Sequence, residues 1–259
     1  MKTISRAMVI SGFIATSFIV FSSCEKSMDN EKSAQYASVI DVLSDGTTSV
    51  IETNVQLAFI ETIVLTDSEL TSLLKMKEEE KLARDVYSTL YQKWGSQQFA
   101  RISAAENNHL NAIILLLKYY GEADTLVNEI GVFTNTEIQT LYNTLISNAS
   151  TSVGEAYKTG ALIEEMDIND LNISLSSTLN DNVIMVFDNL NRGSRNHLRA
   201  FNRQLTSIGL SYTPVYISQA DYDQIVNSAN EKGKQYKMNG KGKGQSNKGN
   251  RGKGDGNCN

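Results

Sequence analysis

Residues 99–117, with the sequence FARISAAENNHLNAIILLL, constrain the fold of this chain more than any other segment. Their apolar side chains recur at steps of three and four, the pattern of a helix that turns one face toward a core. Glu106 and His109 lie on that same face, one helical turn apart. A carboxylate and an imidazole that face a core are destabilising unless another group compensates them. A metal ion does so most simply, because Glu-x-x-His places an oxygen and a nitrogen donor side by side.

A Glu-x-x-His pair by itself is more often a solvated helix face or a hydrogen-bonded core histidine, so the metal hypothesis depends on the other helices. Capping boxes and glycines delimit four long helices, over residues 66–95, 96–120, 152–176 and 181–208. Each of them interrupts an apolar face with potential metal ligands. These are Glu80; Glu106 and His109; Glu164 and Asp167; and His197.

The choice of inward residues leaves one alternative open. Glu165 competes with Glu164, because Leu162 and Ile168 support a register turned by one residue. On the first long helix Glu80 interrupts the apolar face, and the two glutamates that precede it are interpreted as solvated.

Composition and charge exclude several classes of protein. A hydrophobic content of 41% with 20% charged residues is typical of a globular chain, and a single proline with 8% aromatic residues favours helices. Residues 25–230 contain 14 basic and 27 acidic side chains, a net charge of −13. Such an acidic body argues against nucleic acid as a partner.

The first 24 residues resemble a bacterial lipoprotein signal. Lys2 and Arg6 precede an apolar run that is too short to span a membrane comfortably, and small residues follow it. The tetrapeptide FSSC at 21–24 resembles a lipobox, in which Cys24 becomes the lipidated first residue of the mature protein. An ordinary signal peptide with an incidental cysteine is the alternative. We therefore expect a signal peptide at 1–23 and a protein of the cell envelope, held on the membrane through Cys24.

Composition also divides the rest of the chain. Residues 24–64 combine a polar tether with β-branched clusters around Ser44-Asp45-Gly46, which indicate either a hairpin or an irregular segment. A tail rich in Lys, Gly and Asn has no apolar periodicity and is expected to be disordered, and its Cys258 has no evident disulfide partner. The expected units are 24–64, the main domain at 65–217, a short helix at 218–230 and the tail at 231–259.

Motifs in the four long helices resemble the carboxylate-bridged di-iron proteins of the ferritin-like superfamily, and rubrerythrin in particular. These motifs are EKLARDVY at 80–87, ENNH at 106–109, the pair Glu164 and Asp167, and HLRAF at 197–201. The runs EEEKLARDVY, GVFTN, IEEMDINDL and RGSRNHLRAF resemble more closely an uncharacterised ferritin-like family, domain of unknown function 2202. The resemblance implies an all-α fold: a ferritin-like four-helix bundle with one long crossover, residues 121–151, between the second and third helices.

The resemblance also implies a cofactor and an activity. It implies iron, or iron with manganese, in a dinuclear site that reduces peroxide or dioxygen. The chain has no Cys-x-x-Cys pair, so the electron donor would be another protein. A metal-binding protein without turnover and a metal-free helical interaction module are the alternatives, and a homodimer stays open.

One position departs from the family pattern. Ser194, preceded by Gly193, stands where the resemblance implies the glutamate of a second Glu-x-x-His motif. The site would then be an asymmetric dinuclear centre, a single-metal site or a relic without metal. If the gap is functional, it leaves an open position for water or peroxide beside His197, whereas close helix packing explains the glycine equally well.

The lipobox yields the first testable prediction. Replacing Cys24 by Ala should abolish acylation, because the thiol is the acceptor. The variant should then remain unprocessed, or it should be soluble instead of partitioning into detergent. Mass spectrometry of the mature protein measures this directly. A mature wild-type protein with an unmodified Cys24 would reject the prediction.

Overall fold

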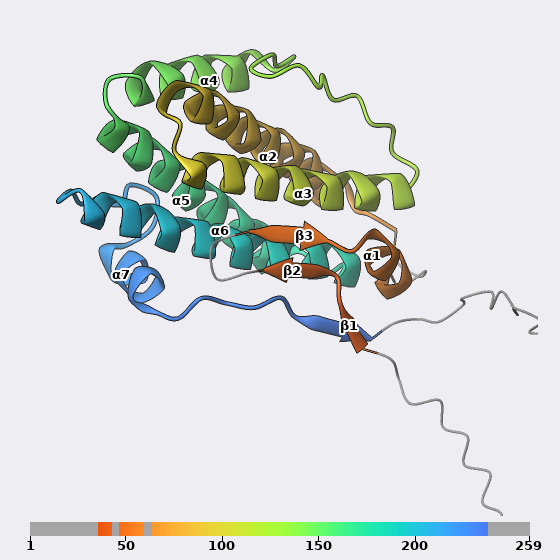
Figure 1. Ribbon diagram of the computed structural model, residues 1–259. Coiled ribbons are helices and arrows are strands. Elements are labelled where there is room, and N and C mark those ends of the chain that lie inside the picture. Colours follow the sequence, from red (N-terminus) through yellow and green to blue (C-terminus); the bar gives the residue numbers. More distant parts are fainter. Residues whose placement is uncertain (1–35, 43–46, 60–63, 238–259) are drawn as a thin grey trace, which may run out of the picture. The chain divides into compact units, whose positions relative to one another are not determined.

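The computed structural model describes residues 36–42, 47–59 and 64–237, and this part of the chain is predominantly α-helical (Figure 1). The predicted all-α class is therefore confirmed at that level. The elements, in chain order, are β1 (Tyr36–Ser38), β2 (Ile40–Val42), β3 (Thr48–Val50), α1 (Glu52–Ala58), α2 (Asp67–Trp94), α3 (Gln97–Tyr119), α4 (Thr136–Ala149), α5 (Val153–Ser177), α6 (Asp181–Ser207), α7 (Gln219–Asn227) and β4 (Gln235–Lys237).

The ends of α2 show why the sequence sets these helices so clearly. Thr66 and Glu69 form a reciprocal capping box, in which the Glu69 amide donates to the Thr66 hydroxyl and the Thr66 amide donates to the Glu69 carboxylate. Glu69 also accepts hydrogen bonds from the amides of Leu179 and Asn180 at the start of α6. At the other end Gly95 has φ 68°, a left-handed conformation that ends the helix at little cost.

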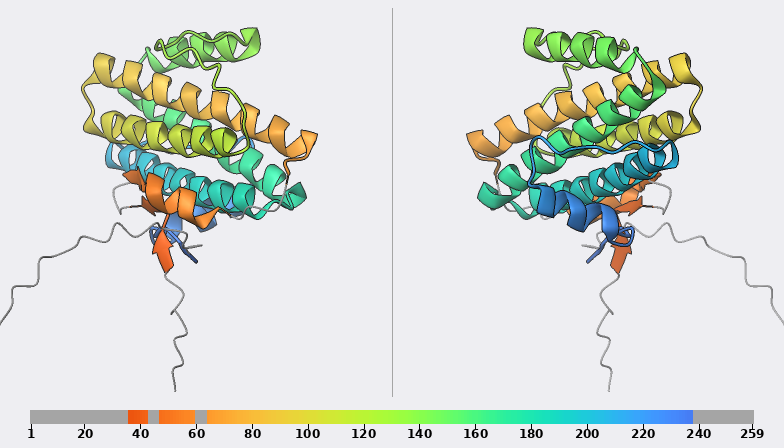
Figure 2. Two further views of the ribbon diagram at one scale, coloured as in Figure 1. Left: turned by 90° about the vertical axis from the view of Figure 1, so that its right-hand side faces the viewer. Right: turned by 90° about the vertical axis from the view of Figure 1, so that its left-hand side faces the viewer.

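The long helices pack as two pairs. The helix α2 lies along α3, and α5 lies along α6, while α2 also contacts α5 and α3 also contacts α6. The connection from α3 to α5 contains α4, which packs on α2 and α5 (Figures 1 and 2). Each pair is joined by a short turn, whereas the connection between the pairs is long.

The interior contains two hydrophobic clusters with a polar layer between them. One, the Phe99 cluster, includes Tyr87, Phe99 and Phe201. The other, the Phe187 cluster, includes Leu73 and Phe187. On each of α2, α3 and α6 the two clusters occupy opposite ends of the buried face, so the residues between them face neighbouring helices rather than solvent.

The crossover is fixed by a buried ion pair on α2. The Lys81 ammonium lies 2.5 Å from the Asp85 carboxylate and donates to the carbonyls of Glu129 and Val132. Asp85 also accepts a hydrogen bond from the amide of Gly131. Because the ammonium and the carboxylate bind backbone groups as well as each other, the pair is satisfied and holds the GVFTN segment on α2.

Short strands flank α3 and α6. The strands β2 and β3 pair in antiparallel fashion with Ile40 opposite Val50, which confirms the hairpin alternative. Its turn, residues 43–46, lies outside the described residues. The helix α1, which the sequence did not indicate, follows β3 directly and contacts α3. Thr48 ties β3 to α3, because its hydroxyl donates to the Ala105 carbonyl and its own carbonyl accepts from the Asn108 side chain.

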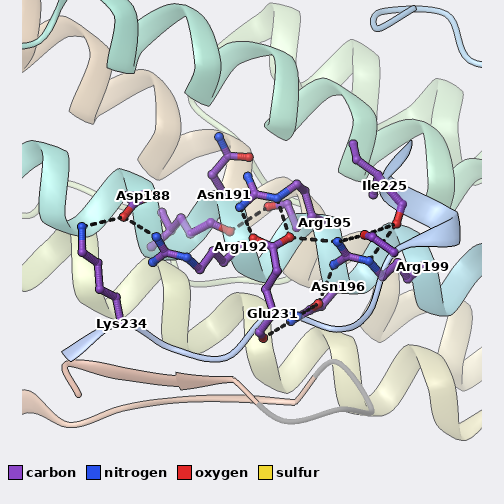
Figure 3. A network of polar contacts seen from close by, with 12 residues as sticks. Asp188, Asn191, Arg192, Arg195, Asn196, Arg199, Ile225, Glu231 and Lys234 are labelled. Carbon is purple, nitrogen blue, oxygen red and sulfur yellow. Dashed lines mark hydrogen bonds and ion pairs between the residues drawn. The ribbon is translucent and has the colours of Figure 1, made fainter. Parts of the chain in front are cut away.

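The segment after α7 is anchored on α6, although the sequence predicted disorder from residue 231. The Glu231 carboxylate accepts hydrogen bonds from Arg195 and Arg199, and its backbone exchanges hydrogen bonds with the Asn196 side chain (Figure 3). Beyond it β4 pairs with β1. Residues 231–237 are therefore attached to the helical domain, because a partly buried side-chain network continues past the last helix.

The predicted signal peptide, Cys24 and residues 238–259 lie outside the described residues. Within the described residues, no helix has the length and apolar character needed to cross a membrane.

Glu165 is fully buried and fixes the loop after α6. One of its carboxylate oxygens accepts the amides of Val215, Tyr216 and Ile217, and the other accepts the Tyr212 hydroxyl. Glu164 and Glu165 are therefore both buried, although the sequence set them as alternatives. Glu164 faces the side chains of the other long helices, and Glu165 faces the loop after α6.

This network predicts a large effect on stability. Glu165→Gln removes the charge that strengthens four hydrogen bonds, and such bonds to a charged group contribute about 1.5–3 kcal/mol each. We expect the free energy of unfolding in urea to fall by about 2–4 kcal/mol. Glu155→Gln on the same helix, at a side chain that is 45% exposed, is the matched control and should change it little. Equal effects of the two substitutions would contradict the assignment.

Candidate metal centre

Four helices bring the predicted ligands into the polar layer. Glu80 comes from α2, Glu106 and His109 from α3, Glu164 from α5 and His197 from α6, and all five are fully buried. Each projects inward because the apolar residues before and after it on the same face belong to the two hydrophobic clusters.

The five side chains form two groups that share Glu106. In the first group, His109 Nδ1 lies 2.7 Å from Glu106 Oε2 and 3.3 Å from Glu80 Oε2. In the second, His197 Nδ1 lies 2.7 Å from Glu106 Oε1 and 3.3 Å from Glu164 Oε2. The two imidazole rings stack with their centroids 5.4 Å apart. Each group therefore offers one nitrogen and two oxygen donors, with one oxygen of Glu106 in each.

Hydrogen bonding leaves much of this layer unsatisfied. Neither oxygen of Glu80 or of Glu106 makes a well-formed hydrogen bond among the described residues, and neither does Glu164 Oε2; their contacts are the ion pairs with the imidazole Nδ1 atoms given above. The other oxygen of Glu164 accepts the Tyr87 hydroxyl at 2.6 Å. Buried carboxylates without donors are costly unless they bind a cation.

The donor set fits a divalent transition metal. Each group is a mixed site of one imidazole and two carboxylates, and such sites suit iron, manganese or zinc rather than soft, thiolate-bound ions. Within the described residues, two sets of metal-ligating side chains converge, and they are these two groups. The structure thus brings together five of the six residues that the sequence predicted as metal ligands, and it alone shows how they divide into two groups.

Asp167 lies beside the two groups rather than in them. Its side chain is buried and its Oδ2 has no hydrogen-bond partner, but no oxygen of it joins either set of converging atoms. Burial, together with the charges of Glu80, Glu164 and Glu79, raises the pKa of Asp167 well above its ordinary value. Asp167 is therefore close enough to sense the centre electrostatically.

The space beside Gly193 is filled by the imidazole ring of His109. A Cβ added at this position would lie 2.5 Å from both Cε1 and Nε2 of His109. Ser194 is fully buried and donates its hydroxyl to the Leu190 carbonyl of its own helix. Gly193 thus gives the His109 ring room to lie against α6, as the alternative of close helix packing predicted. An open coordination position at Ser194 stays a prediction.

Burial and mutual charge set the protonation of the layer. Burial raises the pKa of Glu80 to about 7 and that of Glu164 to about 8. Burial opposes the charged form of His109 as well, but Glu80 and Glu106 outweigh it and raise its pKa to about 9. For Glu106 the two histidines outweigh burial and hold its pKa below the ordinary value. The layer thus keeps protons that the same side chains would release in water.

Sequence reasoning missed two residues that adjoin the centre. Glu79, interpreted as solvated, is only 6% exposed, because α5 covers the side of α2 on which it lies. Thr48 is 1% exposed and lies 3.6 Å from the position of a Cβ on Gly193, so the hairpin closes the α3–α6 side of the layer. The run of three glutamates at 78–80 gave no sign of which were buried, and nothing in the sequence pairs Thr48 with α3.

Comparison with known proteins identifies the family of this chain. The family described as "Uncharacterized protein domain (DUF2202)" matches residues 69–229, and the chain belongs to it. The chain is 44% identical over 170 residues to the uncharacterized protein MJ0754 of Methanocaldococcus jannaschii, a match that covers 65% of this chain and 92% of that protein. The crystal structure of the hypothetical protein MJ0754 is similar with a TM-score of 0.65 at 42% identity, over 66% of this chain and 99% of that one.

The protonation of the layer predicts how the metal-free protein responds to pH. The ordinary pKa of a glutamate is 4.5 and that of a histidine is 6.5, so between pH 5 and 9 the folded state holds protons on Glu80, Glu164 and His109 that the unfolded state releases. Each group lowers the free energy of unfolding by about 1.4 kcal/mol per pH unit between its two pKa values. With a chelator present, stability should therefore fall as pH rises from about 5 to about 9.

Urea titrations at a series of pH values measure this slope. Glu80→Gln should flatten it, because the amide does not titrate, whereas Glu155→Gln should leave it unchanged. If the stability of the metal-free wild-type protein is constant or rises over that pH range, the folded state does not retain the protons on Glu80, Glu164 and His109.

Proposed function

We propose that this protein is a metal-binding member of the ferritin-like superfamily whose polar layer holds two divalent ions, iron or iron with manganese. The single observation that carries the proposal is the pair of Glu/Glu/His groups that share Glu106, in which five of the six buried carboxylate oxygens make no well-formed hydrogen bond. A structural polar layer would be expected to satisfy its own members.

The arrangement of the helices supports the superfamily assignment. Two antiparallel pairs, α2 with α3 and α5 with α6, are separated by the long connection that contains α4, the order that a ferritin-like bundle requires. The motifs at Glu80, Glu106, Glu164 and His197 come from the four long helices in the family order. The departure at Ser194 would leave the second ion with one carboxylate ligand fewer than the family pattern implies.

The residues present define how such a centre would be held. Glu80 and His109 would bind one ion, Glu164 and His197 the other, and Glu106 would contribute one oxygen to each. Tyr87 fixes the rotamer of Glu164 by donating its hydroxyl to the oxygen that faces away from His197. The Phe99 and Phe187 clusters exclude water from both ends of the layer.

The activity that we propose is reduction of peroxide or dioxygen. When bound and reduced, the metal pair would supply two electrons, which suffice to reduce peroxide to water or dioxygen to peroxide. The protein would contribute the fixed positions of its ligands and a buried, carboxylate-rich layer from which water is excluded. Reducing equivalents would come from a separate donor protein, and the lipid anchor at Cys24 would hold the centre in the cell envelope.

The central prediction is that metal stabilises the folded protein. An ion that binds only the folded state at a concentration 100-fold above its Kd stabilises it by about 2.7 kcal/mol, so Fe²⁺ or Mn²⁺ should raise the Tm clearly. Glu106→Gln should abolish most of that gain, because Glu106 belongs to both groups. Anaerobic calorimetry with and without metal measures it.

Two further variants make the test specific. Glu155→Gln, on the exposed face of α5, should keep the full metal-dependent gain. Gly193→Ala keeps every ligand but pushes the His109 ring away, so it should reduce the gain. A Tm that is indifferent to iron, manganese and zinc in the wild-type protein would favour a metal-free helical module. A metal-dependent Tm without peroxide consumption, when a reductant is supplied, would favour a binding protein without turnover.

A further inference from the structure

A line of carboxylates runs from the surface toward the candidate centre between α2 and α5. Asp167 and Asp170 follow Glu164 at steps of three along α5, so the three lie on one face of that helix. Glu79 faces them from α2, where the Lys75 ammonium lies 3.4 Å from Glu79 Oε1 and 2.8 Å from Asp170 Oδ2. We call Glu79, Asp167 and Asp170 the carboxylate seam.

Exposure decreases steadily along the seam. The side chain of Lys75 is 54% exposed, that of Asp170 20% and that of Glu79 8%, whereas Asp167 is buried and Glu164 fully so. Asp167 lies one helical turn from Asp170 and one turn from Glu164, so along this face of α5 it stands between the outer carboxylates and the candidate centre. The seam therefore connects solvent with the centre through acidic groups alone.

The seam differs from the structural carboxylates of this protein. Asp85 and Glu165 are fully buried and accept several hydrogen bonds each, so their charges are balanced by local donors. In contrast, Glu79 Oε2 and Asp167 Oδ2 are buried and have no hydrogen-bond partner. Oxygen atoms that are buried, acidic and without donors are what a hard cation needs as ligands.

Lys75 supplies a stand-in for that cation. Its ammonium lies between Glu79 and Asp170 and, within the described part of the chain, bridges these two carboxylates. The side chain is long and half exposed, so it can swing into solvent at small cost when another cation takes its place.

We propose that the carboxylate seam is the route by which a divalent cation reaches the centre, with Glu79 and Asp170 as its outer binding position and the Lys75 ammonium as the group that the cation displaces. This inference rests on the proposed function, because a route needs a centre to load. In this route Asp167 would bind the cation after the outer position and before it reaches Glu80 or Glu164. The route also explains why Asp167 is buried beside the two groups without belonging to either.

The test separates the rate of metal loading from the affinity at equilibrium. Co²⁺ alone is the probe, its uptake by the full metal-free protein is followed by stopped-flow absorbance, and its affinity and stoichiometry are measured by titration. Removing the outer carboxylates with Glu79→Gln and Asp170→Asn together should slow loading about tenfold or more, because the oxygen ligands that would hold the ion at the outer position are lost. The final stoichiometry and the Kd should stay at their wild-type values.

The opposite change is expected at Lys75. Lys75→Met removes the competing ammonium and should speed loading about threefold or more. Glu78→Gln on α2 and Lys158→Met on α5 make the same charge changes away from the seam, and both should load at the wild-type rate. If the double variant does not fold, Asp170→Asn alone tests the exposed end of the seam, with Lys75→Met as its counterpart.

Three results would overturn the inference, and they are distinguishable. Wild-type protein that takes up no Co²⁺ would overturn the proposed function together with the route. Wild-type loading with unchanged rates in the seam variants would overturn the route and leave the centre standing. A loss of affinity in the Glu79 and Asp170 variants as large as their loss of rate would make these residues ligands of the centre rather than its route.

Discussion

Desolvation of the buried ionisable side chains is the constraint on which the rest of this structure depends. The layer at Glu80, Glu106 and His109 separates two hydrophobic clusters, which solvate its charges poorly: among the described residues, the hydrogen bond that they give it is the one from the Tyr87 hydroxyl to Glu164. Mutual contacts compensate only part of the cost, because each histidine serves two carboxylates. The layer is therefore a place where stability is given up, and residues that give up stability in a core are those for which a function is the natural explanation.

The same helices also contain buried charged side chains whose hydrogen-bonding groups are satisfied. Lys81 with Asp85 fixes the crossover, and Glu165 fixes the loop after α6, and in both cases backbone donors or acceptors complete the network. These satisfied groups surround the unsatisfied ones and hold the helices at fixed positions and rotations. A centre with ligands from four helices needs that support, since an error of a single helical position would turn a ligand away from the others.

The elements outside the matched family residues, 69–229, add to the enclosure of the layer. The β2–β3 hairpin covers the α3–α6 side through Thr48, and the segment after α7 binds α6 through Glu231. The hairpin side is where Gly193 lets the His109 ring approach α6. The seam between α2 and α5, which ends at Asp170 and Lys75, lies on other helices, so the hairpin does not obstruct it.

The sequence by itself determined the long helices, their caps and which acidic and histidine side chains interrupt their apolar faces, because these depend on local periodicity and on residue types that a core rejects. Glu80, Glu106 and His109 could be identified in this way since each interrupts an apolar face. Only the tertiary structure decided the burial of Glu79, the role of Glu165, the contact of Gly193 with His109 and the pairing of β1 with β4. Each of these depends on a partner far away in the chain, and a helical pattern gives the direction of a side chain but not what that side chain meets.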